Sequence, residues 1–188
     1  MRDRDTRQRP IAAFAALFAI VALPTAGSAA ESYGIGRTAT PEEIAGWNID
    51  IAPDGAGLPT GHGDVTEGRA IFGEKCAACH GAEGEGTPMD RLVGGFGTIF
   101  DAKPKKTVGS YWPYATTLFD FVRRAMPFDA PQSLTPDQVY ALCAYILFLN
   151  KLVPADAVLD ARTLPKIEMP SRGYFESAYP PKPEAPAP

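Results

Sequence analysis

The sequence predicts an all-α domain with extended, mostly irregular arms on its N-terminal and C-terminal sides. Apolar residues recur at helical spacing in three segments, residues 64–79, 115–125 and 135–149. Residues 81–113 are rich in glycine instead, which is typical of loops. A weak alternation at residues 48–51 is a hint of one short strand. We therefore expect helices to form the core.

The first predicted helix begins between Asp64 and Thr66 and continues to Cys79. The side chain of Asp64 or Thr66 can accept hydrogen bonds from the free backbone amides of the first turn, and Glu67 is favourable near the positive end of the helix dipole. Gly68 is unusual inside a helix, because glycine lowers helix stability. It marks either the close approach of another helix or a frayed first turn, and both readings stay open.

The other two predicted helices have clear ends. The second covers residues 115–125 and stops there, because Pro127 pushes the residue before it out of the helical region. The third begins after Thr135, a suitable N-cap that forms a capping box with Gln138. Residues 139–149 are almost wholly apolar, so this helix is expected to be buried on more than one side.

Residues 1–30 have the features of a secretory signal peptide. Basic residues come first, an apolar run follows over residues 11–23, and small residues precede the expected cleavage site after Ala30. A retained membrane anchor is the alternative, but thirteen apolar residues fall short of the ~20 that a spanning helix needs. We therefore expect a periplasmic protein with no membrane span in the mature chain.

Four segments follow the signal peptide: an N-terminal arm (31–62), the main domain (63–153), a C-terminal extended arm (154–178) and a proline-rich tail (179–188). Trp47 is too apolar to be left wholly exposed, so the N-terminal arm is expected to pack on the domain. Scattered apolar residues predict that the C-terminal arm lies along the domain surface. The tail is polyproline-like and is expected to be disordered.

The charge of the mature chain excludes some partners. The full chain has 18 basic and 22 acidic residues, of which the signal peptide accounts for four Arg and two Asp. The mature chain therefore has 14 basic and 20 acidic residues, a net charge of −6. Nucleic acids and anionic lipid surfaces attract proteins with a basic face. We expect neither of them as a partner.

The segment Cys-Ala-Ala-Cys-His at residues 76–80 is the pattern of covalent haem c attachment. Cys76 and Cys79 lie about one helical turn apart, so both thiols can bond vinyl groups on the same porphyrin edge. His80 can then bind the iron through a neutral imidazole nitrogen. The signal peptide agrees with this pattern, because haem is attached to both cysteines outside the bacterial cytoplasm.

Two other uses of a Cys-x-x-Cys pair are a redox disulfide and half of a zinc site. A thioredoxin-like redox site would follow a strand, whereas the residues before Cys76 are predicted to be helical. A zinc site needs a second pair of ligands, and elsewhere the chain offers only Cys143 and His62. One covalent haem c is therefore the expected cofactor.

The group that fills the sixth position of the iron decides what the haem does. A strong protein ligand favours electron transfer, whereas an open position can bind or activate a small molecule. The candidates are Met126, Met89, Met169, His62 and Cys143. Met126 is favoured because it lies 46 residues after His80, at a helix end followed by the rigid Pro127, whereas Met89 lies only nine residues after His80. The alternative for Met126 is a core-filling role.

The remaining conspicuous side chains have simpler explanations. Cys143 lies on an apolar helical stripe and is expected to be an inert buried thiol. His62 lies among glycines and is expected at the surface. Tyr111, Trp112 and Tyr114 are candidates for the wall of the haem pocket, where their rings can cover the porphyrin.

With these residues placed, the chain resembles class I cytochromes c over roughly residues 65–150. In that family an N-terminal helix, here with Gly68 and Phe72, crosses a C-terminal helix that carries an aromatic residue, here Tyr145. The resemblance implies three to five helices around one covalently bound haem. It also implies His80 and Met126 as the axial ligands of the iron.

A closer resemblance is carried by the segments GIGR, WNIDIAPDG, KTVGSYWPYA and RRAMPF at residues 34–37, 47–55, 106–115 and 123–128. They are similar to the haem subunits of periplasmic sulfite and Sox-type sulfane dehydrogenases. The resemblance implies that a molybdenum-cofactor subunit is the electron donor and that another cytochrome or an oxidase is the acceptor. Sox-type members carry a second haem domain, whereas this chain has one Cys-x-x-Cys-His motif, so the sulfur substrate stays open.

Two functions remain open at this point. In the first, His80 and Met126 saturate the iron, and the chain is a one-electron carrier or subunit with no catalytic residues of its own. In the second, the chain is a haem enzyme or sensor whose sixth iron position is open or displaceable, so that a sulfur compound or a gas binds there. The motifs favour the first function.

Overall fold

The computed structural model describes residues 35–176 and residue 178. The predicted signal peptide (1–30) and the predicted disordered tail (179–188) lie outside the described residues. The chain divides into two compact units, Met1–Thr38 and Ala39–Pro188, and every described helix and strand belongs to the second unit. Within the described ranges, no helix combines the length and the apolar character that crossing a membrane requires.

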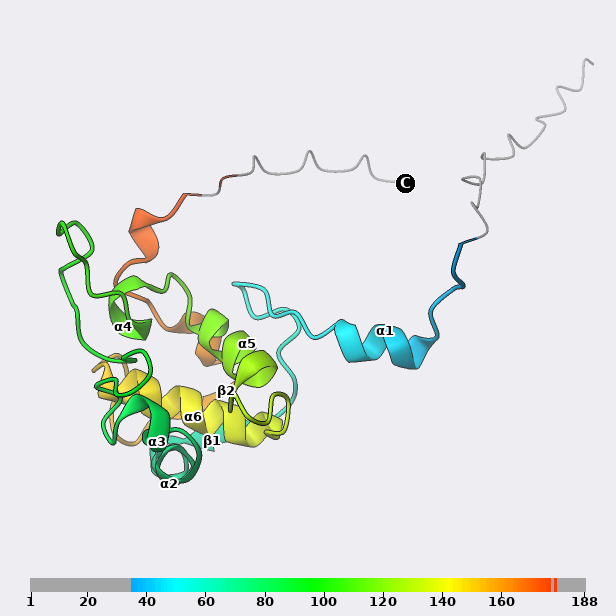
Figure 1. The fold of residues 1–188 in the computed structure, drawn as a ribbon, viewed down its shortest axis with the longest axis horizontal. Helices are drawn as coiled ribbons and strands as arrows, with labels where there is room; N and C mark the ends of the chain where they lie inside the picture. Colours follow the sequence, from blue (N-terminus) through cyan, green and yellow to red (C-terminus); the bar gives the residue numbers. More distant parts are fainter. Residues whose placement is uncertain (1–34, 177, 179–188) are drawn as a thin grey trace, which may run out of the picture. The chain divides into compact units, whose positions relative to one another are not determined.

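The described residues form a helix-rich fold with one small sheet (Figure 1). In chain order the elements are α1 (Pro41–Trp47), β1 (His62–Asp64), α2 (Val65–Lys75), α3 (Ala77–His80), α4 (Val108–Tyr111), α5 (Ala115–Ala125), α6 (Pro136–Leu149), β2 (Val158–Asp160) and the 3₁₀ turns η1 (Leu164–Lys166) and η2 (Arg172–Tyr174). The expectation of an all-α fold is wrong in one respect, because β1 and β2 pair as an antiparallel sheet. Each strand has only three residues, too few for a clear alternation.

The predicted helix starts are confirmed. Asp64 caps α2 by accepting a hydrogen bond from the backbone N–H of Glu67 (2.8 Å), and the Glu67 side chain accepts one from the N–H of Asp64 (3.1 Å). Thr135 and Gln138 form the same reciprocal box at the start of α6. Helix α5 covers the predicted segment and has Met126 as its C-cap. These boxes satisfy backbone donors that would otherwise be unpaired.

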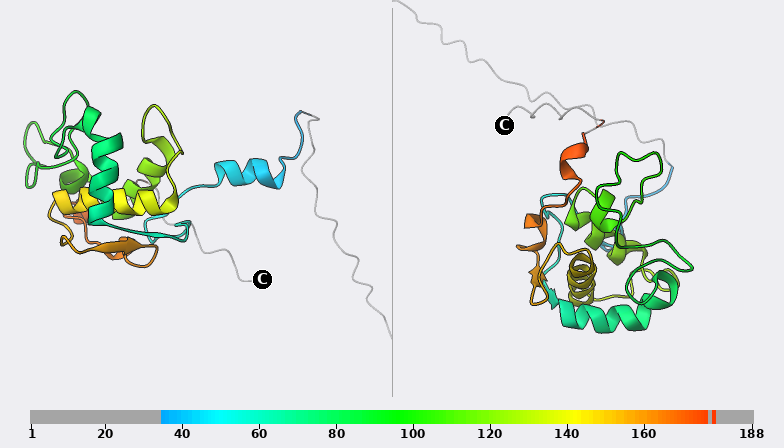
Figure 2. Two further views of the ribbon diagram at one scale, coloured as in Figure 1. Left: turned by 90° about the horizontal axis from the view of Figure 1, so that it is seen from below. Right: turned by 90° about the vertical axis from the view of Figure 1, so that its left-hand side faces the viewer.

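Helix α6 is the centre of the core, and α2 crosses it (Figure 2). Nine of its fourteen residues are buried. At the crossing, a Cβ added to Gly68 would collide with the carbonyl of Ala141, so the two backbones approach as closely as glycine allows. Phe72 of α2 packs edge-on against Tyr145 of α6, with ring centroids 5.3 Å apart. Close helix approach is therefore the correct explanation of Gly68.

The N-terminal arm contacts the helices through its second half. Asp50 forms an ion pair with Arg124 of α5 (2.8 Å), and Pro59 accepts a hydrogen bond through its carbonyl from the hydroxyl of Tyr140 (2.8 Å). No strand forms at residues 48–51. The reason given for the packing of this arm is wrong, because α1 contains no buried residue and Trp47 is 85% exposed.

The C-terminal arm supplies part of the core and then a surface contact. Leu164 and Met169 are buried in the main hydrophobic cluster. Farther along, Ser171 donates a hydrogen bond through its hydroxyl to the carbonyl of Ser110 (2.6 Å), which links this arm to α4. Two aromatic pairs extend the contact, Phe100 with Tyr174 and Tyr111 with Phe175.

The turn after β2 makes the stability of the fold depend on pH. Backbone hydrogen bonds from Thr163 and Arg162 lower the pKa of Asp160 from 3.8 to about 2. A carboxylate whose pKa is lowered by folding stabilises the protein above its unfolded pKa, and this contribution is lost as the pH falls from about 4 through about 2. The turn leads directly into Leu164, which is fully buried.

We therefore expect Asp160→Asn to lower the free energy of unfolding at pH 7 and to have a much smaller effect at pH 2. Denaturant unfolding followed by circular dichroism at pH 7, 4 and 2 measures this difference. Asp156→Asn, at an exposed position on the preceding loop, is the control and should change little at any pH. If Asp160→Asn lowers the free energy of unfolding equally at all three pH values, the ionised carboxylate of Asp160 is not the source of the stabilisation.

Candidate functional site

The two cysteines and the histidine lie on one tight turn. Helix α2 ends at Lys75, and Cys76 leaves the helical conformation, with φ −124° and ψ −34°. The short helix α3 then carries Cys79 and His80, whose backbone N–H groups both donate to the carbonyl of Cys76 (3.1 and 3.0 Å). The predicted continuous helix to Cys79 is therefore interrupted at the first cysteine.

The environment of Cys76 differs from that of a reactive redox cysteine. Burial raises the pKa of its thiol to about 11, an effect that Lys75 opposes and Cys79 reinforces. Reactive Cys-x-x-Cys thiols have lowered pKa values, so a thiol that stays protonated at neutral pH disfavours disulfide-exchange chemistry. In the described part of the chain, no three His, Cys, Asp or Glu side chains group as metal ligands.

The imidazole of His80 is held by a backbone carbonyl. Its Nδ1 lies 2.7 Å from the carbonyl oxygen of Asp90. Because a carbonyl can only accept, Nδ1 carries the proton and donates, and Nε2 keeps a free lone pair that can bind a metal. This arrangement is the usual second-sphere support of a metal-binding histidine.

The loop after His80 folds back to present that carbonyl. Gly86 donates its N–H to the carbonyl of His80 (2.7 Å), and Met89 donates to the carbonyl of Cys79 (2.9 Å). Sequence reasoning missed Asp90, because the interaction uses a main-chain oxygen that every residue type provides.

Met126 lies at the end of α5, at the edge of the hydrophobic core. It is the C-cap of α5, with an extended backbone conformation, and its N–H donates to the carbonyl of Val122 (3.1 Å). The residue is half-buried and packs against the main hydrophobic cluster. The structure therefore leaves Met126 partly accessible at the C-terminal end of α5.

The other sulfur and imidazole candidates lie in less suitable places. Met89 is 56% exposed on the loop after α3, whereas Met169 is only 4% exposed within the core. Cys143 is fully buried, and this burial raises the pKa of its thiol. His62 is exposed on β1. Cys143 and His62 thus lie as the sequence predicts.

The three aromatic residues proposed for the pocket wall are half-buried and are held by neighbouring side chains. Trp112 packs edge-on against Phe121 of α5, with ring centroids 5.6 Å apart. Cations lie over the other two rings, Lys106 over Tyr111 (4.6 Å) and Arg172 over Tyr114 (5.3 Å). These contacts fix the rings and place two positive charges beside them.

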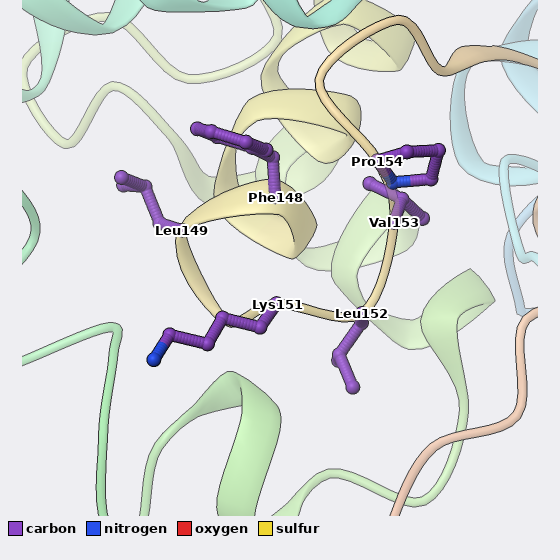
Figure 3. Close-up of a pocket in the computed structure, with 6 residues that line it drawn as sticks. All are labelled: Phe148, Leu149, Lys151, Leu152, Val153 and Pro154. Atoms are coloured by element: carbon purple, nitrogen blue, oxygen red, sulfur yellow. The ribbon is translucent and has the colours of Figure 1, made fainter.

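An open hollow of about 650 Å³ lies at the C-terminal end of α6 (Figure 3). Its lining is mostly apolar and consists of Phe148, Leu149, Lys151, Leu152, Val153 and Pro154. None of these residues belongs to the Cys-x-x-Cys-His turn, and Met126 is not among them. The candidate site therefore consists of the turn and Met126, and this hollow is separate from it.

Cys76, Cys79 and His80 fit a covalently attached haem. They provide two unpaired thiols on one turn and an imidazole whose Nε2 is free. Cys76 is half-buried and Cys79 is exposed.

Comparisons with known proteins agree with this fit. The family model described as cytochrome c oxidase, cbb3-type, subunit III matches residues 63–146. One chain of the crystal structure of the sulfane dehydrogenase SoxCD from Paracoccus pantotrophus is 44% identical, with a TM-score of 0.72. The match covers 77% of this chain and 72% of that one.

Two curated relatives are thiosulfate dehydrogenases. The protein from Psychrobacter arcticus is 27% identical over 58% of this chain, and that from Stutzerimonas stutzeri is 30% identical over 47% of it. The matches span only 35% and 28% of those two relatives. Their similarity is therefore limited to one part of each protein.

Proposed function

Because the chain belongs to the c-type cytochromes, which bind haem c covalently, we propose that it is a periplasmic monohaem electron carrier. The observation that carries this proposal is the His80 imidazole, whose Nδ1 is occupied by the Asp90 carbonyl and whose Nε2 is free for iron. Bound haem supplies an iron that exchanges one electron at a time. The predicted signal peptide supports the periplasmic location, and the single Cys-x-x-Cys-His motif supports one haem.

Four residues have proposed roles at the haem. Cys76 and Cys79 form the thioether bonds, and His80 is the first axial ligand. Met126 is the second, supported by its half-buried place at the rigid end of α5. A thioether ligand stabilises ferrous iron and raises the reduction potential, which suits a protein that accepts electrons.

The proposed electron donor is a molybdenum-cofactor subunit of a sulfur-compound dehydrogenase. The similarity to a chain of the sulfane dehydrogenase structure supports this choice, because it extends over most of both chains. We propose another cytochrome or an oxidase as the acceptor. The mature net charge of −6 favours partners with a basic docking surface.

A second candidate function is a haem enzyme that binds a sulfur compound at the iron. The two thiosulfate dehydrogenases among the relatives are the observation that favours it. This function requires Met126 to be displaced from the iron or never to bind it. The two candidates therefore differ in the accessibility of the iron.

The test of the proposed partner is isolation of the tagged cytochrome from its own host, followed by elemental analysis for molybdenum. We expect molybdenum to co-purify, and we expect sulfite or thiosulfate to reduce the haem in that preparation and not in the cytochrome expressed alone. Reduction of the isolated cytochrome by either compound, at the same rate and without a second protein, would support the enzyme instead.

A further inference from the structure

Asn150 is a buried polar side chain outside the proposed ligand set. It is the residue after the end of α6 and is 1% exposed. Its Nδ2 donates hydrogen bonds to the carbonyl oxygens of Ile146 (2.9 Å) and Leu92 (3.1 Å). Its Oδ1 is buried and has no hydrogen-bond partner within the described residues.

The neighbours of this amide fix its orientation. Both partners are carbonyl oxygens, which only accept hydrogen bonds, so the nitrogen must face them. The unpaired oxygen costs stability, and an apolar side chain of similar volume would avoid that cost. The amide of Asn150 links the end of α6 to Leu92, which lies 58 residues earlier in the chain.

Leu92 ends the loop that holds His80. The carbonyl two residues earlier, that of Asp90, accepts the hydrogen bond from His80 Nδ1. The N–H of Leu92 donates to the carbonyl of Gly84 (2.8 Å), which closes the loop on itself. The hydrogen bond from Asn150 therefore ties the loop that supports His80 to the end of α6.

Gly109 restrains the same amide from α4. A Cβ added to Gly109 would collide with Oδ1 of Asn150 and would meet its Cγ at 2.7 Å. Any side chain at position 109 must displace the amide of Asn150. The chain thus offers two independent ways to disturb the link, one at the amide and one beside it.

We propose that Asn150 is a positioning residue for His80, which keeps the Asp90 carbonyl on the imidazole by holding the loop at Leu92. This inference rests on the proposed ligation of iron by His80. A carbonyl that accepts from Nδ1–H makes the imidazole a stronger donor to the metal, which favours the ferric state. A looser loop therefore weakens the hydrogen bond and raises the reduction potential.

The test compares the wild-type holoprotein with Asn150→Leu and Gly109→Ala. In the ferric protein the Nδ1 proton of an iron-bound histidine gives a strongly shifted NMR resonance, and its exchange with D₂O reports opening of that hydrogen bond. We expect this exchange to be about tenfold faster or more in both variants. We also expect both variants to have a higher reduction potential in a redox titration.

Tyr140→Phe is the matched control, because it removes a side-chain hydrogen bond from α6 to the carbonyl of Pro59, away from the loop. It should leave the exchange rate and the potential unchanged. Wild-type values in both Asn150→Leu and Gly109→Ala would overturn the inference, and Gly109→Ala decides alone if Asn150→Leu does not fold. Absence of the shifted resonance from the wild-type protein would instead overturn ligation by His80, and the inference with it.

Discussion

Replacing Met126 with alanine is expected to open the sixth position of the iron and to lower the reduction potential. Loss of a thioether removes a ligand that favours ferrous iron, and axial ligands move haem potentials over a range of about 0.8 V. We expect a fall on the order of 0.2 V, within that range. The ferric variant should also lose the weak long-wavelength absorption band of methionine–iron coordination, and the ferrous variant should bind carbon monoxide.

Met89→Ala is the matched control, because Met89 is exposed on the loop after α3 and deleting its side chain should have little effect on the core. It should keep the long-wavelength band and the wild-type potential. Survival of the band in Met126→Ala, or its loss in Met89→Ala, would show that Met126 is not the ligand. Far-ultraviolet circular dichroism establishes that both variants keep their helices.

The second large effect is expected at the crossing of α2 and α6. Gly68→Val places a branched side chain where even a Cβ collides with the carbonyl of Ala141. The two helices must then separate, which disrupts the packing of Phe72 on Tyr145. We expect the free energy of unfolding to fall by about 3 kcal/mol, at the upper end of the cost of overpacking. Denaturant unfolding at pH 7 measures the change.

Gly73→Val is the control for helix propensity, because Gly73 lies on the same helix with nothing within 4 Å of an added Cβ. Its effect should stay within about 0.5 kcal/mol, as for an ordinary surface position. Equal effects of the two substitutions would show that backbone approach at Gly68 does not limit stability.

The helices could be predicted from the sequence because their signals are local. The capping box at Thr135 and the proline after Met126 act within a few residues, and the structure has α6 and α5 where these signals place them. The role of Gly68 could be narrowed to two explanations but not decided. Glycine is required at position 68 by the Ala141 carbonyl on another helix, and no pattern in the neighbouring sequence shows that contact.

The parts that could not be predicted depend on distant pairing or on main-chain atoms. Strands β1 and β2 are three residues long and pair across almost the whole domain. Asp90 supports His80 through its carbonyl, and so its side chain gives no indication of the role. For the N-terminal arm, one expectation from the sequence is wrong. That expectation relied on the hydrophobicity of Trp47 alone, and the side chain is exposed.

The accessibility of the iron in the wild-type protein tests the central claim most directly. If His80 and Met126 both bind the iron, the ferrous protein should keep its absorption spectrum when carbon monoxide is added in stoichiometric amounts. Immediate and complete binding of carbon monoxide under these conditions would contradict a saturated electron-transfer haem. It would favour an enzyme or a sensor with an open iron site.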